Sequence, residues 1–507
     1  MSVDTPAWVR DAVFYQIFPD RFAASEHVPK PGPLEPWDAP PTQHGFKGGD
    51  LLGIVDHLDY LEDLGVNAIY MTPIFKSASN HRYHTYDYFE VDPLLGGDEA
   101  LRVLLDRAHA RGMRVILDGV FNHTGRGFWP FHHILENGAA SPYRDWFHLD
   151  REVLDGRREL TPYPRGDEPT GASLGYEAWW GLPALPKLNT DHPDVREMLL
   201  SVAEHWLRFG IDGWRLDVPT EIDDPSFWSA FRQRCRAVRP DAYLVGEIWE
   251  TAPEWVAGDR FDALMDYPLA EAIVGFVGGP SLDMAVVRGH HEYASHIRPL
   301  DGPSFSARLL DLLGVYDADV VAVQLNLLGS HDAPRVLTVL SGDTAALRLA
   351  TLLQCLLPGA PSIYYGDEIG LQGGNDPACR GAFPWDPARW DTVLRTYVKA
   401  VLALRRHEPA FRHGSTVVVG ATGDAIAIER RLGQDRLVVA VNAGAEPLDI
   451  GVVIDGGATG RLEPVALDGW DATPVPRPSS ILDGRASLAM TARSGGVWRV
   501  VASAGTG

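Results

Sequence analysis

Short apolar runs separated by amphipathic segments constrain the fold of this chain more than any other feature. Eight such runs are rich in Val, Ile, Leu and Tyr and are too short for a typical helix, which is typical of buried parallel strands. Two of the intervening segments have apolar residues at three- and four-residue intervals and end before Gly112 and Gly210. This alternation predicts an α/β fold, a (β/α)8 barrel. The expected strands are 13–18, 66–71, 115–120, 213–218, 243–248, 264–267, 321–328 and 362–365, and the expected helices are 101–111 and 195–209.

Two stretches interrupt this pattern. Residues 122–186 are rich in Pro, Gly, Trp and His, and so long a segment predicts an inserted subdomain after the third strand. After residue 413, alternating strands are broken by Gly, Asp and Asn, which predicts a C-terminal antiparallel β-sandwich. Its tryptophans, Trp470 and Trp498, form no recognisable sugar-binding platform, so we expect it to cover apolar barrel surface. The predicted division is barrel 1–121, inserted subdomain 122–186, barrel 187–413 and sandwich 414–507.

Charge and cysteine content exclude several classes of function. The 45 basic and 68 acidic residues give a net charge of −23, so nucleic acid and anionic membranes are unfavourable partners and a neutral ligand is expected. The three cysteines, Cys235, Cys355 and Cys379, have no C-x-x-C spacing, which argues against a disulfide framework or a zinc site. The sequence shows no signal peptide and no apolar run of about 18 residues, so the expected location is the cytoplasm.

Acidic residues follow several of the predicted strands. Asp118, Asp217, Glu247 and Asp332 come at the ends of the third, fourth, fifth and seventh strands. In a barrel of this kind, the carboxyl ends of the strands meet at the face that carries active sites. Any one of these acids alone has a structural interpretation, as a helix cap or a loop ion pair. The residues around these acids favour a functional interpretation, because basic side chains lie next to them or at equivalent strand ends, namely His123, Arg215 and His331.

Glycoside hydrolysis is the chemistry that needs such a set. One carboxylate attacks the anomeric carbon and a second, kept protonated, donates to the leaving oxygen. Arg215 lies two residues before Asp217 and therefore points to the same side of the strand, where it can hold that carboxylate ionised. Aromatic side chains in the loops offer stacking surfaces for sugars, although core packing is an equally good explanation for each of Trp179, Trp180, Trp249 and Trp255.

Five short blocks resemble the conserved regions of the α-amylase family of glycoside hydrolases. The resemblance covers nearly the whole chain and implies that Asp217 is the nucleophile, Glu247 the general acid/base and Asp332 the carboxylate that orients the transition state. It also implies that His123, Arg215 and His331 line the subsite of the cleaved sugar. The blocks are DGVFNH at 118–123, LPKLNT at 185–190, GWRLDV at 213–218, GEIW at 246–249 and LLGSHD at 327–332.

Further residues are implied by the same resemblance. HRYHTYDYF at 81–89 is similar to a family segment whose histidine and tyrosine match His81 and Tyr83 at that subsite. Within the family, the chain most resembles the neopullulanase, cyclomaltodextrinase and maltogenic amylase group. This implies that Glu221 lies near the acceptor subsites and that Asp376 and Arg380 lie near the donor side, although a loop ion pair explains the latter two equally well.

The sequence also departs from that group. Pro219 and Thr220 give VPTE where the group has VANE, which leaves the preference between α-1,4 and α-1,6 linkages open. The chain begins almost at the first barrel strand, so we expect the group's N-terminal domain to be missing and leave the oligomeric state open. The first loop lacks the Asp and Asn cluster that binds calcium in many relatives. We therefore expect no metal and no required cofactor, with calcium, held by Asp50 and Asn122, as the less favoured alternative.

Together these observations predict a retaining hydrolase of neutral α-glucans, acting on maltooligosaccharides, cyclodextrins or pullulan. Cleavage of α-1,4 bonds is expected, with α-1,6 bonds left open. The alternatives are an exo-acting α-glucosidase or transglycosylase on short maltooligosaccharides and, more remotely, a catalytically silent amylase-like binding module.

Overall fold

In a computed structural model that describes residues 3–164, 174–454, 459–467 and 476–502, the chain begins with a barrel of eight parallel strands. The strands are ordered β8-β7-β6-β5-β2-β1-β10-β9, and a parallel bridge between Met265 and Leu325 joins the first to the last. The predicted (β/α)8 barrel is thereby confirmed. Its strands are β1 (Phe14–Ile17), β2 (Ala68–Met71), β5 (Arg114–Gly119), β6 (Gly213–Leu216), β7 (Tyr243–Gly246), β8 (Ala263–Leu264), β9 (Leu325–Asn326) and β10 (Ala360–Tyr364).

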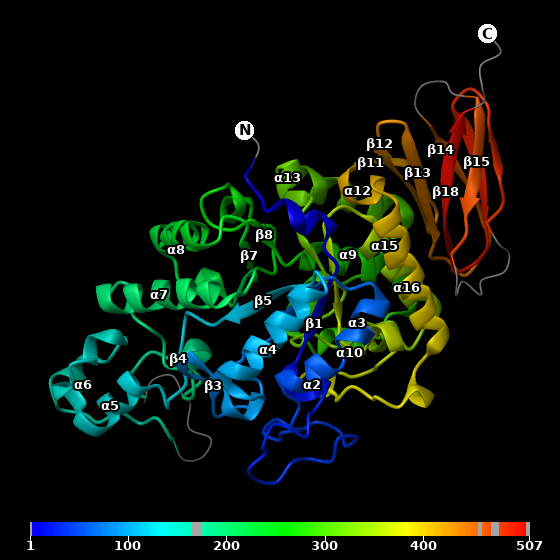
Figure 1. The fold of residues 1–507 in the computed structure, drawn as a ribbon. Helices are drawn as coiled ribbons and strands as arrows, with labels where there is room; N and C mark the ends of the chain where they lie inside the picture. Colours follow the sequence, from blue (N-terminus) through cyan, green and yellow to red (C-terminus); the bar gives the residue numbers. More distant parts are fainter. Residues whose placement is uncertain (1–2, 165–173, 455–458, 468–475, 503–507) are drawn as a thin grey trace.

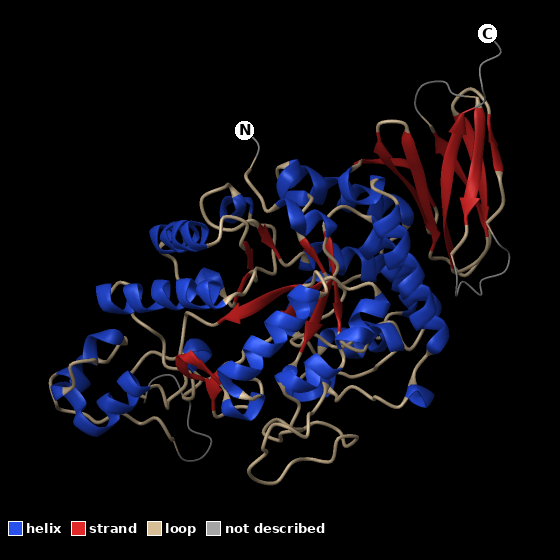
Figure 2. Cartoon of the chain, viewed as in Figure 1, coloured by secondary structure: helices blue, strands red, loops and turns tan. Residues whose placement is uncertain are grey.

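Helices surround the strands on the outside of the barrel (Figures 1 and 2). The two helices expected from periodicity are α4 and α7, and each buries its apolar stripe against the sheet. No helix in the described ranges is long and apolar enough to cross a membrane. The helices up to the sandwich are α1 (Pro19–Phe22), α2 (Leu51–Asp56), α3 (Leu58–Leu64), α4 (Gly97–Ala110), α5 (Trp129–Asn137), α6 (Arg151–Leu154), α7 (Pro193–Phe209), α8 (Pro225–Val238), α9 (Tyr267–Gly278), α10 (Met284–Arg288), α11 (His291–His296), α12 (Gly302–Val315), α13 (Ala318–Val321), α14 (Val336–Val339), α15 (Thr344–Leu356), α16 (Thr392–His407) and α17 (Ala410–His413).

Two predicted strands are shorter than expected because helix caps intervene. The sixth was expected to reach residue 267, but the Asp266 carboxylate accepts from the amide of Leu269 and starts α9 at Tyr267. The seventh was expected to begin at residue 321, but α13 ends there, after a cap formed by Asp317. An apolar run of this length fits either a strand or the end of a helix. The capping residues therefore determine where the helix lies and where the strand can form.

The inserted residues form a lobe at one side of the barrel, around α5 and α6 (Figure 1). Between the barrel and this lobe lies a hairpin of β3 (Phe75–Ser77) and β4 (Thr85–Val91). The C-terminal strands form the expected antiparallel sandwich, a six-stranded sheet packed with a two-stranded one. Its strands are β11 (Ser415–Thr422), β12 (Ala425–Leu432), β13 (Asp435–Asn442), β14 (Leu448–Val453), β15 (Gly460–Val465), β16 (Ser479–Ile481), β17 (Arg485–Met490) and β18 (Ser494–Ala502).

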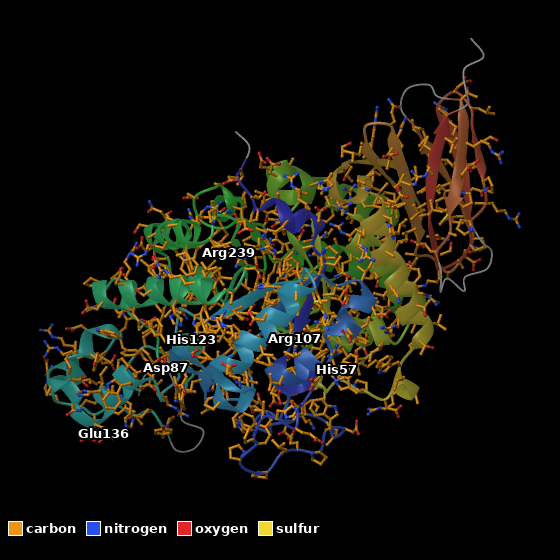
Figure 3. All side chains as sticks on the ribbon, in the orientation of Figure 1. His57, Asp87, Arg107, His123, Glu136 and Arg239 are labelled. Atoms are coloured by element: carbon orange, nitrogen blue, oxygen red, sulfur yellow. The ribbon has the colours of Figure 1, made fainter. Side chains whose placement is uncertain are left out.

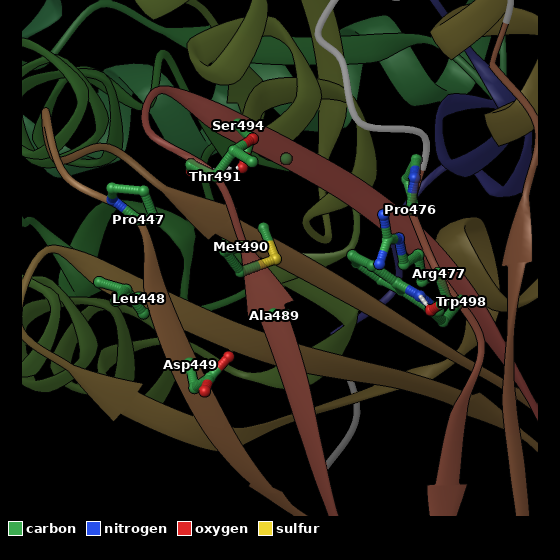
Figure 4. A pocket seen from close by; sticks show the side chains of 11 residues that line it. Pro447, Leu448, Asp449, Pro476, Arg477, Ala489, Met490, Thr491, Ser494 and Trp498 are labelled. Atoms are coloured by element: carbon green, nitrogen blue, oxygen red, sulfur yellow. Dashed lines mark hydrogen bonds between the residues drawn. The ribbon is translucent and has the colours of Figure 1, made fainter.

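A hollow of about 490 Å³ lies in the sandwich (Figure 4). Its lining includes Leu448, Met490 and Trp498. Trp498 is only 2% exposed, and its indole NH donates to the carbonyl of Arg477 over 2.9 Å. The indole is therefore part of the core of the sandwich and has no exposed face on which a sugar could stack. Trp470 lies outside the described residues.

A buried carboxyl on α9 makes the stability of the fold depend on pH. Burial raises the pKa of Glu271 to about 8, with Glu292 and Asp266 adding to the shift and Arg308 opposing it. An acid with a folded-state pKa above its unfolded value destabilises the fold progressively between the two values. We expect Glu271→Gln to raise the free energy of unfolding by about 1–3 kcal/mol at pH 8.5 and to have little effect at pH 4.5. Thermal unfolding of both proteins at the two pH values checks this, and an equal effect at both would contradict it.

Candidate active site

A single guanidinium lies at the centre of the site. Arg215, on β6, is fully buried; its Nη1 donates to Asp118 over 2.8 Å and to Asp217 over 2.9 Å. Its Nη2 lies 2.9 Å from the carboxylate of Glu247. The strand order explains this convergence, because β5, β6 and β7 are neighbours and one of these acids lies at or directly after the end of each. The predicted nucleophile and acid/base thus share one cation.

Burial controls the protonation of the two carboxyls. It raises the pKa of Glu247 to about 7, with Arg215 opposing the shift and Asp332 adding to it. Burial also raises the pKa of Asp217, again against the attraction of Arg215, and the charge of Glu247 adds to that shift. The two buried carboxyls share the guanidinium of Arg215, so the protonation of one affects the pKa of the other.

The third carboxylate, Asp332, stands closer to solvent, with 32% of its side chain exposed. Its oxygens lie 3.1 Å from His331 Nε2 and 3.2 Å from Arg380 Nη2. Burial opposes ionisation, but His331, Arg380 and Arg215 outweigh it and hold the pKa of Asp332 below its ordinary value. Arg380 also pairs with Asp376 at 3.0 Å. Arg380 thus pairs with both Asp376 and Asp332, and a binding role for Asp376 and Arg380 stays a prediction beside the ion pair.

Tyr83 joins the hairpin loop to the strand ends. Its hydroxyl donates to Asp118 over 2.8 Å, and its ring stacks on His331 with centroids 5.3 Å apart and planes at 3°. Gln16, on β1, donates to Nδ1 of His331 over 2.9 Å, which leaves the proton of the neutral imidazole on Nε2. Burial lowers the pKa of His331 to about 3, so the ring stays neutral.

Two further predicted histidines lie at the same end of the barrel. His123, labelled in Figure 3, is 1% exposed and stacks on Trp179 with centroids 5.1 Å apart. Burial lowers the pKa of both His123 and His81. His81 accepts from the amide of Tyr83, which fixes its ring beside the stacking tyrosine. Trp180 stacks on Trp179 and is 66% exposed, so this aromatic column reaches solvent.

Glu221 follows the nucleophile in a 3₁₀ turn over Pro219–Glu221. Its carboxylate pairs with Lys187 at 3.1 Å, and Lys187 also lies 3.4 Å from Glu177. The lysine of the LPKLNT block therefore joins the inserted segment to the loop after β6. Neither the lysine nor this connection is apparent from the sequence pattern alone.

The two candidate calcium ligands have different surroundings. The carboxylate of Asp50 accepts from the amides of Ser25 and Gly53 and pairs with the ammonium of Lys30 at 3.0 Å. The amide of Asn122 contacts His123. An ammonium thus supplies the positive charge at Asp50, whereas the side-chain oxygen of Asn122 is buried and lacks a hydrogen-bond partner among the described residues. The absence of calcium stays a prediction.

Sequence reasoning missed two features of the site. Val218 has a φ of +34°, although β-branched residues rarely adopt positive values, and its amide donates to Glu247 over 3.1 Å. Backbone strain of this kind is concentrated at functional sites. Tyr70, on β2, donates to Asp118 over 3.0 Å. The hydroxyl of Tyr70 in an otherwise apolar strand could have indicated its role. The positive φ of Val218 could not be predicted, because valine rarely adopts it.

Comparisons with known proteins agree with this geometry. The family description "Alpha amylase, catalytic domain" matches residues 16–401. A cyclomaltodextrinase from Geobacillus thermopakistaniensis is 44% identical over 454 residues, which cover 89% of this chain and 72% of the relative. The crystal structure of Ttha1563 from Thermus thermophilus has a TM-score of 0.88 and 48% identity, covering 97% of this chain and all of that one.

A debranching enzyme from Nostoc punctiforme has a TM-score of 0.86 and 43% identity, covering 98% of this chain and all of its own. The matched region includes every strand of the barrel except the first two residues of β1. Identity at this level, over most of both chains, extends well beyond a shared architecture. The chain therefore belongs to the alpha-amylase family of glycoside hydrolases.

Proposed function

We propose that the protein hydrolyses α-glucosidic bonds of short neutral α-glucans with retention of configuration. A carboxylate oxygen of Asp217 bonds to the anomeric carbon while the carboxyl proton of Glu247 passes to the leaving oxygen, which departs with the bond electrons. Water then attacks the same carbon, gives its proton to Glu247 and displaces Asp217. Asp332 contacts the sugar and orients it as positive charge develops on the ring.

The observation that carries the proposal is the shared binding of Asp217 and Glu247 by Arg215. One cation brings the two carboxyls together, as the short separation of a retaining enzyme requires. The raised pKa of Glu247, about 7, supports its assignment as the proton donor. Asp217 Oδ2 and His123 Nε2 are buried and lack a hydrogen-bond partner among the described residues. We assign these atoms to the substrate, the first to the anomeric carbon and the second to a sugar hydroxyl.

Short α-glucans fit the charge and the walls of the site. A net charge of −23 favours a neutral ligand, and the Trp179–Trp180 column offers a stacking face for sugar rings. The relationship to a cyclomaltodextrinase supports cleavage of α-1,4 bonds in maltooligosaccharides and cyclodextrins. The three cysteines are buried free thiols, which suits a reducing cytoplasm as the place of action.

Cleavage of α-1,6 bonds is a second candidate activity. Pro219 and Thr220 replace the VANE pattern directly after the nucleophile, where the leaving sugar would lie. Proline fixes its own φ, so the turn that presents Glu221 is stiffer than one built from Ala and Asn. The similarity to a debranching enzyme supports the same candidate.

Product analysis on β-cyclodextrin, pullulan, soluble starch and maltotriose tests these proposals side by side. We expect cyclodextrin to be opened and maltotriose cleaved faster than starch, and any attack on α-1,6 bonds to appear in the products of pullulan. Release of glucose alone from maltotriose, with cyclodextrin untouched, would favour an exo-acting α-glucosidase instead. Transfer products longer than the substrate would favour a transglycosylase. No turnover of any of the four would favour a silent binding module.

A further inference from the structure

A buried histidine that takes no part in the proposed chemistry lies between two of its loops. His290 precedes α11 and is 7% exposed. Its side chain is hydrogen-bonded to the backbone carbonyl of Asp332, and its ring contacts Trp249, two residues after Glu247. These two carboxyl-bearing loops follow different strands, β9 and β7, so a side chain that contacts both is placed to couple them.

The hydrogen bonds of His290 define which nitrogen carries its proton. Nδ1 accepts from the amide of Tyr293 over 3.3 Å, which caps the first turn of α11. Nε2 lies 3.0 Å from the backbone carbonyl of Asp332 and must therefore be the donor. Burial lowers the pKa of His290, which keeps the ring neutral. The imidazole therefore donates a hydrogen bond through Nε2 and accepts one through Nδ1.

The backbone of Asp332 is held on both sides. Its carbonyl accepts from His290, and its amide donates to the hydroxyl of Ser330 over 3.2 Å. Tyr267 donates to the same hydroxyl over 3.3 Å. These two hydrogen bonds hold the backbone of Asp332, so the orientation of its side chain is set before substrate binds.

The ring of His290 contacts a tryptophan on the other loop. Trp249, two residues after Glu247, lies 5.5 Å from the ring of His290 with planes at 36°. It also stacks on Tyr267 at 3.6 Å and 14°. Trp249 is partly buried and packs against the core two residues after Glu247, which is assigned the proton transfer to the leaving oxygen. Through this packing, the orientation of Trp249 bears on the loop that carries the proton donor for the leaving sugar.

We propose that His290 is a positioning residue with two separable actions. Its Nε2–H aims the carboxylate of Asp332, and its ring holds Trp249 against the leaving sugar. This inference rests on the proposed function, since it assigns roles relative to that reaction. It predicts that loss of the donor lowers kcat for every substrate, whereas loss of the ring raises KM only for substrates with a leaving sugar.

Two variants separate the actions. His290→Phe keeps an aromatic ring beside Trp249 and removes the donor, and His290→Gln keeps a donor and removes the ring. The substrates are maltotriose, which has a leaving sugar, and α-maltosyl fluoride, which has none. We expect the Phe variant to lose about tenfold in kcat on both, as for one hydrogen bond. We expect the Gln variant to raise KM for maltotriose about fivefold and to leave maltosyl fluoride unaffected.

An exposed histidine at the end of α16 provides the control. His407→Gln makes the same substitution on an exposed side chain, and it should leave both parameters unchanged. Equal losses by both His290 variants on both substrates would overturn the two-action proposal in favour of a general packing role. Wild-type values in both would overturn it entirely. A wild-type protein that hydrolyses neither substrate would refute the proposed function itself, which separates the two failures.

Discussion

Asp217→Asn is expected to lower kcat on α-glucans by at least about 10⁴-fold, because the amide cannot form the glycosyl-enzyme bond. The side chain keeps its size, and Arg215 Nη1 can still donate to its remaining oxygen. The fold should therefore persist, with a thermal unfolding midpoint within a few degrees of that of the wild type. Steady-state kinetics on maltotriose and a thermal scan measure both quantities.

The matched control is Asp223→Asn, the same substitution on an exposed residue six positions further along the chain. It should retain wild-type turnover. If Asp217→Asn also retained it, the assignment of the nucleophile would be wrong. If it instead unfolded the protein, kcat would be compared with that of Arg215→Lys, in which the carboxylate of Asp217 remains but loses the Nη1 donor that binds it.

The second large effect is expected from Glu247→Gln. The glutamine cannot donate a proton to the leaving oxygen, so kcat on maltotriose should fall by about 10²- to 10⁴-fold. α-Maltosyl fluoride has a leaving group that needs no protonation, so its first step should be nearly unaffected. Azide needs no general base and should restore the second step. A variant that lost activity on both substrates equally, with no response to azide, would contradict the role of acid/base.

The pH profile gives an independent test of the same residue. Glu247 donates only when protonated, and burial raises its pKa to about 7. The wild-type kcat/KM should therefore fall as the pH rises above about 7, whereas an ordinary glutamate would already be ionised near pH 4.5. Glu247→Gln should lose this alkaline limb in its residual activity on maltotriose. An unchanged limb in the variant would assign it to another group.

The barrel and the ends of its strands were predictable because they depend on local pattern. Buried parallel strands are apolar throughout, and the acids that follow β6, β7 and β9 stand out against them. The boundaries of β8 and β9 were not predictable, since the caps at Asp266 and Asp317 override the apolar run. Sequence spacing places residues at strand ends but does not say which side chains meet.

The contacts that organise the site come from segments far apart in the chain. Gln16 fixes the tautomer of His331, and Lys187 joins Glu221 to the inserted lobe. Neither pair has a spacing or pattern that points to it, because tertiary packing alone brings the partners together. His290 is the extreme case, since its surroundings in the sequence, GHHEY, resemble an exposed polar turn.

The central claim is a covalent intermediate on Asp217, and direct detection tests it best. Glu247→Gln treated with α-maltosyl fluoride should accumulate the intermediate, because the first step proceeds while the second lacks its base. Mass spectrometry of the intact protein should show the addition of one maltosyl group, and peptide analysis should place it on Asp217. An adduct on another residue, or a β-configured product released by the wild type with no adduct in the variant, would contradict the account.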